Sequence, residues 1–550
     1  MGSQGTTCRV AKKTGICFFL LLFSTVLGVP RGWSQQDAGK TILANRCSGC
    51  HTPQEGDGRL DSIEFERKTP EAWEMSIDRM VRSRGVQLQP NEARTLVKYL
   101  SDQYGLAPAE VEPFRYALER RNSTVEQKVS QAVRGTCVQC HSYARIALQR
   151  RTPDTWKRLP DLTAALLPNL ENQTASAGLL DDFWYTVVKK ESVPYLTKKY
   201  PFASKEWQEW QAATKPNYAG VWKVVGHDPG KGGDYTGQLT LKALGDDKYE
   251  GEFTHEFADG SKVSGKTTAL VYTGFQWRGI AQLDGGKRQK EIFFARADGS
   301  VISGRRLLTE IGDLGRDETL YKSGSGARLL AVSPTALKTG ETQKVKLFGM
   351  ALPQNLTAEA VTLGEGVKIK SLSQNGGDSV IAEVVADKEA KVGPRRAKIQ
   401  GVEGELPLYV YRTVDYIRLS PEQAFARPGG VRTPKVSQQF EVFAYLNGKD
   451  GVKGTKDDIK LDRIAPVKWD LEEYVKRIND DDVRFVGAVD ENGLFTPAND
   501  GPNPQRHMSE ENVGDVWVEA WYKPEGAKRP MGARAHLLVM PPKFNFQPIE

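Results

Sequence analysis

A five-residue pattern that occurs twice constrains this chain more than any other feature. The pattern C-x-x-C-H stands in RCSGCH (residues 46–51) and again 90 residues later in TCVQCH (residues 136–141). Two thiols and an imidazole so close together are compatible with a zinc site, a redox-active dithiol or disulfide, or covalent attachment of a haem. Each of these chemistries requires a different fold around the motif.

Haem attachment accounts for every part of the pattern. In c-type attachment two thiols add to the vinyl groups of the haem, and the next residue supplies its imidazole to the iron. A zinc site does not require a histidine after each pair, and a thioredoxin-like dithiol needs only one motif beside a strand–helix unit. We therefore predict two covalently attached haems c, with zinc or disulfides as the alternatives. The predicted attachment residues are Cys47, Cys50, Cys137 and Cys140, and the predicted iron ligands are His51 and His141.

The first residues have the layout of a secretory signal peptide. Three basic residues precede an apolar run from Ile16 to Leu27, and small residues follow it. A membrane anchor is the alternative, but the run is shorter than the ~20 residues that span a bilayer. We predict cleavage near residue 34, export to the periplasm of a Gram-negative bacterium, and no membrane span.

Cleavage there would lower both the number of cysteines and the net charge of the chain. Of the six cysteines, Cys8 and Cys17 would leave, so the four that remain are those of the two motifs. The removed segment holds four basic and no acidic residues, which leaves 72 basic against 69 acidic residues in place of a net charge of +7. A nearly neutral mature chain does not indicate a nucleic-acid partner.

The surroundings of the two motifs are also duplicated. KTPEAWEMSIDRM (residues 68–80) follows the first motif and RTPDTWKRLPDLT (residues 151–163) follows the second. Thr69 and Thr152 are expected to be helix N-caps, because a proline occupies the next position in both copies. An apolar stripe predicts a further helix, and it consists of Ala93, Leu96, Val97 and Leu100. We predict two α-helical cytochrome c units in tandem, about 35–108 and 109–212.

The first unit resembles small c-type cytochromes. These proteins have a helix before C-x-x-C-H, a methionine downstream, and a closing helix that ends in Tyr-Leu, here Tyr99-Leu100. The resemblance implies a methionine as the sixth iron ligand, which raises the reduction potential. Met80 fits better than Met75, because it stands in the Arg-Met pair before the closing helix, whereas Met75 is expected to fill the core.

The second unit lacks this methionine. Thr163 stands where Met80 would align, and no methionine occurs between His141 and Met350. A second histidine could complete the site, and the remaining candidates are His227, His255, His507 and His536. His227 is nearest in sequence, although a histidine in a glycine-rich loop is more often a solvated residue. A bis-histidine haem would have a lower reduction potential than a His/Met haem, so the two haems would differ in potential and form an internal electron gradient.

Beyond about residue 212 the helical pattern ends. Short alternating runs such as KYEGEFTHEF (residues 248–257) indicate antiparallel strands that form a closed barrel or a sandwich over 213–327. VSPTALKTGETQKVKLFGMAL (residues 332–352) resembles the start of an immunoglobulin-like domain of the IPT type, expected over 328–413. We expect a second immunoglobulin-like β-sandwich over 414–550. The predicted fold class is thus multidomain, with a helical tandem cytochrome c domain followed by an all-β barrel and two β-sandwiches.

This domain order, together with GVWKVVGHDPGKGGDYTG (residues 220–237), resembles the α subunit of bacterial quinohemoprotein amine dehydrogenases. Members of that family are heterotrimers with β and small γ subunits, and the γ subunit carries a cysteine tryptophylquinone that oxidises primary amines to aldehydes and ammonia. The resemblance implies that this chain accepts electrons from that quinone. It would pass them to a soluble cytochrome c or cupredoxin.

The cysteine count supports this division of labour. A quinone cross-linked by thioethers consumes cysteines, and the two motifs use all four mature ones. Amine oxidation is therefore expected in the partner subunit, and no catalytic residue is predicted here. Alternatives are an electron-transfer subunit of another periplasmic dehydrogenase, a dihaem peroxidase, or a β-rich binding module that carries a cytochrome.

Overall fold

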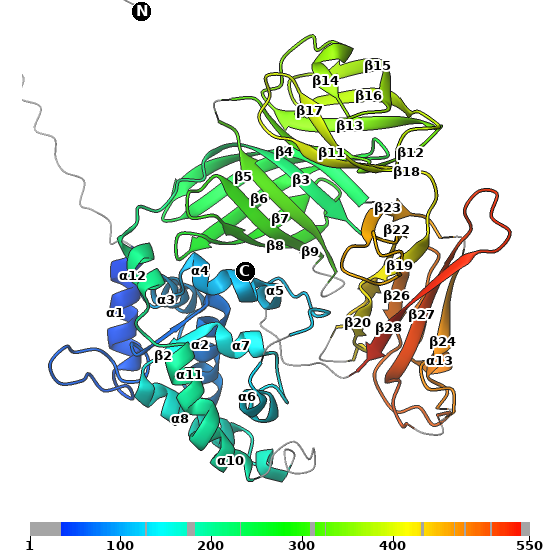
Figure 1. Cartoon of the computed structure of the whole chain (residues 1–550). Helices are drawn as coiled ribbons and strands as arrows, with labels where there is room; N and C mark the ends of the chain where they lie inside the picture. The colour runs from blue at the N-terminus through cyan, green and yellow to red at the C-terminus, as the bar shows by residue number, and fades with distance from the viewer. Residues whose placement is uncertain are drawn as a thin grey trace, which may run out of the picture.

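The computed structural model describes residues 35–126, 129–172, 182–230, 233–308, 314–324, 326–430, 434–466, 468–477, 480–506 and 509–540. The predicted signal peptide, residues 1–34, lies outside this part of the chain. A helical region lies against one end of a β-barrel, and two further β-regions follow (Figure 1). The predicted multidomain order of a helical region and then β-structure is therefore confirmed in outline.

The first helical unit consists of α1 (Gln35–Cys47), α2 (Pro70–Arg84) and α3 (Pro90–Gln103). The Thr69 hydroxyl accepts a hydrogen bond from the Ala72 N–H at 3.4 Å, so Thr69 caps α2 as predicted. Gly85, with φ of 72°, ends that helix. The predicted apolar stripe faces the core of the unit, where Leu96 and Leu100 are buried.

The second unit is built from shorter helices, and Thr152 caps its long helix α8 in the same way, accepting from the Thr155 N–H at 3.3 Å. Its elements are α4 (Pro108–Val111), η1 (Glu112–Phe114), α5 (Arg115–Leu118), α6 (Gln131–Thr136), α7 (Tyr143–Ala147), α8 (Pro153–Leu166), α10 (Trp184–Val187), η2 (Val188–Ser192), α11 (Val193–Lys199) and α12 (Lys205–Ala212).

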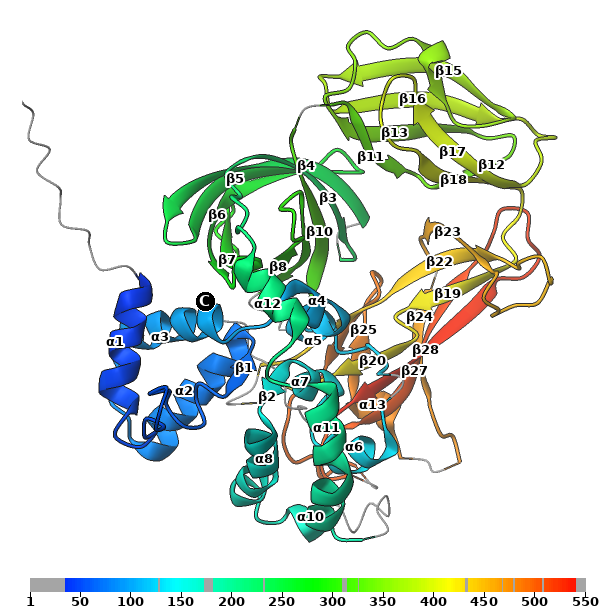
Figure 2. The same cartoon turned by 60° about the vertical axis from the view of Figure 1, so that its left-hand side comes forward.

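A short antiparallel ribbon joins the two units (Figure 2). Its strands are β1 (Glu66–Lys68) and β2 (Gln149–Arg151), and Arg67 pairs with Arg150 at the centre. Both strands precede the duplicated Thr-Pro segment, so the pairing relates the units by a local twofold axis. Glu110 forms ion pairs with both central arginines. It accepts from Arg67 at 2.8 and 3.0 Å and lies 2.9 Å from the Nε of Arg150.

Among the described residues, eight strands form the closed barrel in the order β10-β3-β4-β5-β6-β7-β8-β9. The strands are β3 (Gly220–Asp228), β4 (Gly233–Gly245), β5 (Lys248–Phe257), β6 (Lys262–Tyr272), β7 (Gln276–Leu283), β8 (Arg288–Ala295), β9 (Val301–Leu308) and β10 (Gly315–Lys322). The antiparallel strands predicted over 213–327 therefore form a closed barrel and not a sandwich. Its core, which includes Trp222, is continuous with Leu106 and Leu148 of the helical region.

The third region contains two four-stranded sheets around one apolar core. One sheet has the order β11 (Arg328–Ser333), β13 (Thr342–Met350), β16 (Ser379–Ala386), β15 (Val367–Asn375). The other has the order β12 (Ala336–Lys338), β18 (Leu406–Tyr411), β17 (Gly393–Ile399), β14 (Val361–Thr362), with η3 (Ala358–Ala360) before β14. Val345 and Leu347 of β13 are fully buried, and because they are two positions apart they lie on the same face of the strand.

The described part of the fourth region contains three sheets. They are β19 (Tyr416–Ser420), β22 (Glu441–Leu446), β23 (Ile459–Ile464); β20 (Gln423–Ala426), β28 (Met531–Val539), β27 (Gly514–Tyr522), β24 (Lys468–Glu473); and β21 (Gln438–Gln439), β26 (Leu494–Pro497), β25 (Gly487–Val489). Helix α13 (Asp482–Phe485) precedes β25. The immunoglobulin-like topology of the third and fourth regions stays a prediction.

Candidate haem sites

The first motif follows directly from the end of α1. The N–H of His51 donates to the Cys47 carbonyl at 2.9 Å, and the N–H of Cys50 donates to the same oxygen at 3.2 Å. This tight turn brings both thiols and the imidazole to the wall of one cavity of about 640 Å³. Met80, from α2, lines the same cavity. The structure therefore brings together all four side chains predicted for the first haem.

The imidazole of His51 is oriented by its backbone contact. Its Nδ1 lies 2.9 Å from the carbonyl oxygen of Asp61. Because a carbonyl only accepts, Nδ1 carries the proton and Nε2 keeps the lone pair that a metal ion requires. Two thiols, this imidazole and the Met80 thioether form a donor set that fits a c-type haem.

The second motif follows α6 and also places its thiols and imidazole at one cavity. The N–H of Cys137 donates to the Val133 carbonyl at 2.8 Å, and Cys137, Cys140 and His141 line a cavity of about 470 Å³. The Nδ1 of His141 lies 2.9 Å from the carbonyl oxygen of Ser142, which again leaves Nε2 as the metal-binding atom.

Burial controls the protonation of this second site. Burial lowers the pKa of His141 to about 4, so its imidazole is neutral at physiological pH. Burial also raises the pKa of the Cys137 thiol to about 11. A neutral imidazole, a half-buried Cys137 thiol and an exposed Cys140 thiol at the wall of one cavity suit the attachment of a haem.

The two methionines of α2 line different cavities. Met80 lines the first cavity, whereas Met75 lines the second one. Thr163, which occupies the position equivalent to Met80, lines the second cavity too. Met75 is therefore a candidate sixth ligand for the second iron. Counting downstream from His141 could not reveal it, because Met75 belongs to the other unit and precedes the second motif.

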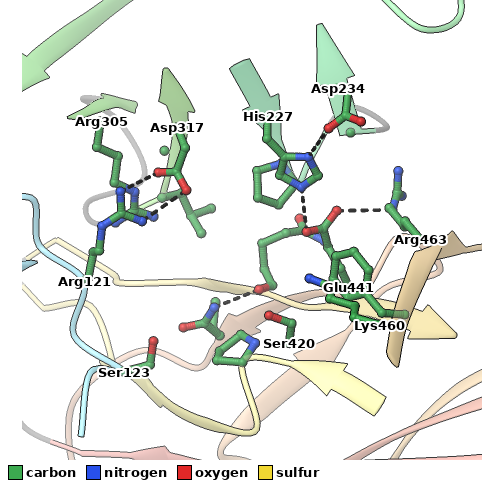
Figure 3. Close-up of a pocket in the computed structure, with 18 of the residues that line it drawn as sticks. Arg121, Ser123, His227, Asp234, Arg305, Asp317, Ser420, Glu441, Lys460 and Arg463 are labelled. Atoms are coloured by element: carbon green, nitrogen blue, oxygen red, sulfur yellow. Dashed lines mark hydrogen bonds and ion pairs between the residues drawn. The ribbon is translucent and has the colours of Figure 1, made fainter. Parts of the chain in front are cut away.

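His227 lies elsewhere, so the structure does not support it as an iron ligand. It is on β3, and its ring bridges two carboxylates, with Nδ1 2.9 Å from Asp234 and Nε2 2.8 Å from Glu441 (Figure 3). Burial alone would lower the pKa of His227, but these two hydrogen bonds outweigh burial and raise it to about 10. Both ring nitrogens are thus engaged, and the ring lines a polar cavity of about 950 Å³ between the barrel and the fourth region.

The other described histidines also lie away from the haem cavities. His255 is fully buried inside the barrel between Tyr235 and Phe253. His536 of β28 stacks on Tyr474 and lies 2.9 Å from a carboxylate oxygen of Asp515. His507 falls outside the described residues.

Four sequence models that together cover most of the chain match it. They describe the quinohemoprotein amine dehydrogenase alpha subunit: its haem-binding region (residues 37–207), domain II (residues 216–322), domain III (residues 326–412) and domain IV (residues 417–549). The chain belongs to the quinohemoprotein amine dehydrogenase alpha-subunit family. It is thus an oxidoreductase subunit with a haem-binding domain, as its sequence resemblance predicted.

Other comparisons add little to this membership. No curated protein matches the chain. Solved structures match with low scores. A de novo designed fluorescence-activating β-barrel is 18% identical, with a TM-score of 0.17, and the match covers 19% of this chain and 94% of that one. The ICAM-5 D1–D4 ectodomain fragment is 12% identical, with a TM-score of 0.13, and the match covers 59% of this chain and 96% of that one.

Among the described helices, none combines the length and apolar character needed to cross a bilayer.

Proposed function

We propose that this alpha-subunit family member is the dihaem electron-transfer subunit of an exported amine dehydrogenase. The observation that carries the proposal is the pair of C-x-x-C-H sites, each at a cavity of several hundred Å³ and each with a histidine oriented through Nδ1. The redox chemistry would come from the two haems, which gain and lose single electrons.

The roles of the chain's residues follow from their positions at the two cavities. The thiols of Cys47 and Cys50 would hold the first haem, and those of Cys137 and Cys140 the second. His51 and His141 would each supply Nε2 to an iron, oriented by their backbone partners. Met80 would complete the first site, and its thioether would favour the reduced iron.

The amine chemistry would take place in a partner subunit. The family name denotes one subunit of a larger enzyme, and we propose β and small γ partners, with a cysteine tryptophylquinone in γ. All four cysteines after residue 34 belong to the haem motifs, which leaves none in this chain for such a cofactor. A cytochrome c or cupredoxin in the periplasm would receive the electrons, after export and cleavage of residues 1–34.

Purification of the intact complex tests this proposal. We expect two covalent haems per chain by pyridine haemochrome assay, and reduction of both by a primary aliphatic amine under anaerobic conditions. A tertiary amine of similar size serves as the control and should leave the haems oxidised. A complex with two haems that remain oxidised in the presence of primary amines would refute the amine dehydrogenase assignment, and turnover of peroxide by one of the haems would favour a peroxidase.

A further inference from the structure

The two haem cavities share one wall. Six residues line both of them: Lys68, Ser76, Arg79, Arg151, Leu159 and Leu162. These six form three pairs that are equivalent in the duplicated segments, with a constant offset between the two copies. The local twofold axis of the β1–β2 ribbon therefore passes through this wall, and the cavities lie on either side of it.

The charged side chains of the β1–β2 ribbon alternate between its two faces. Arg67 and Arg150 point away from the cavities toward Glu110, and their neighbours Glu66, Lys68 and Arg151 line the cavities. Successive side chains of a strand lie on opposite faces, so this separation follows from the register of the pair.

The cavity side of the ribbon carries a large excess of positive charge. Lys68 and Arg151 are 4% and 8% exposed, Arg79 of α2 lies beside them, and Arg145 lines the second cavity. Glu66 is the one acidic side chain among the described residues that line either cavity. Four cations thus face one carboxylate in a largely buried setting.

Two of these cations have lowered pKa values. Lys68 Nζ donates to Glu66 at 2.5 Å and to Ser76 at 3.1 Å, yet burial lowers the pKa of Lys68 to about 8. Burial also lowers the pKa of Arg145 to about 9. Anions close to such buried cations would stabilise their charged forms.

The haem itself supplies anions of the required kind. Each haem bears two propionate carboxylates on the edge opposite the vinyl groups that react with the thiols, so two haems supply four negative charges. Guanidinium and ammonium groups bind carboxylates through charge-assisted hydrogen bonds. Arg79 Nε is buried without a hydrogen-bond partner among the described residues, and it is therefore available to such a carboxylate.

We propose that this cationic wall, defined as Lys68, Arg79, Arg145 and Arg151, binds propionates of both haems and raises their two reduction potentials together. The inference rests on the proposed dihaem function. A ferric haem carries one more positive charge than a ferrous haem, so a nearby cation destabilises the ferric form and favours reduction. Because Lys68, Arg79 and Arg151 line both cavities, the loss of one charge affects both irons.

Spectroelectrochemical titration of the intact complex tests the inference. Arg79→Gln should lower the midpoint potentials of both haems with unchanged covalent haem content, and Arg79→Lys should restore most of both shifts. The shifts should largely persist at high salt, because Lys68 and Arg151 are buried and Arg79 is half-buried. Arg82→Gln is the matched control. It removes a cation from the same helix, but the Arg82 side chain is 78% exposed and paired with Asp78, so both potentials should stay as in the wild type.

If Arg79→Gln does not assemble, Lys68→Met serves as the second variant with the same expectation. Unchanged reduction potentials, or a shift confined to one haem, would overturn the proposal that the cationic wall acts on both haems. The proposed function would remain intact. A wild-type chain without two covalent haems would overturn the proposed function itself and this inference with it.

Discussion

Replacement of His227 by glutamine is expected to weaken the junction between the barrel and the fourth region, and to do so only below about pH 10. The imidazolium of His227 joins Asp234 of β4 to Glu441 of β22, two strands that belong to different domains. Arg463 also lies 3.2 Å from Glu441, so the carboxylate keeps one cation when the histidine is lost.

The magnitude follows from the two contacts. A hydrogen bond to a charged group contributes about 1.5–3 kcal/mol. Glu441 has a side chain that is 7% exposed, whereas Asp234 is 54% exposed and its contact is screened. We therefore expect a loss of about 2 kcal/mol, mostly from the contact with Glu441. The pKa of His227 is raised in the folded protein, so this stabilisation is complete below pH 6.5 and is lost as the pH rises to about 10.

Urea unfolding followed by tryptophan fluorescence measures this effect at pH 6 and at pH 10. With a slope of about 2 kcal/mol per molar urea, the variant should unfold about 1 M earlier at pH 6. Most of this difference should be gone at pH 10, about the pKa of His227. His536→Gln is the control, because it removes a histidine–aspartate contact within the fourth region and should leave the barrel transition unchanged. An equal difference between variant and wild type at both pH values would refute the reasoning.

Three further substitutions test the helical region. Met80→Ala should abolish the methionine–iron charge-transfer band of one haem without loss of covalent haem, and persistence of that band would exclude Met80 as a ligand. Glu110→Gln should destabilise the helical region by about 3–5 kcal/mol, because it leaves the buried Arg67 and Arg150 without their shared carboxylate. A melting temperature equal to that of the wild type, followed by the Soret band, would contradict this. Gly39→Ala would place a Cβ 2.3 Å from the Cβ of Tyr99, where α1 crosses α3. This overlap should lower the free energy of unfolding by about 1–3 kcal/mol. An unchanged melting temperature in the same assay would contradict the close crossing.

Features that depend on neighbouring residues could be predicted from the sequence. The C-x-x-C-H turn is complete within five positions, and the caps Thr69 and Thr152 act on residues three positions ahead. Alternation along KYEGEFTHEF identified an antiparallel strand, because the side chains of a strand with one buried face repeat every two residues. Met80 lies one helix beyond His51, close enough for the cytochrome-like spacing to place it at the same cavity.

Other features were decided by contacts between distant segments. His227 is the histidine nearest in sequence to the second motif among the candidates. It nevertheless contacts Glu441, 214 residues away, because the end of β3 lies beside β22 of the fourth region. Met75 lines the cavity of the other unit because the pairing of β1 with β2 brings the two units side by side. The sequence by itself determined the two attachment motifs and the local elements around them, since short-range geometry suffices for these. Only the tertiary structure decided which side chains complete each site and that the cavities share a charged wall, since these depend on long-range strand pairing that no local pattern encodes.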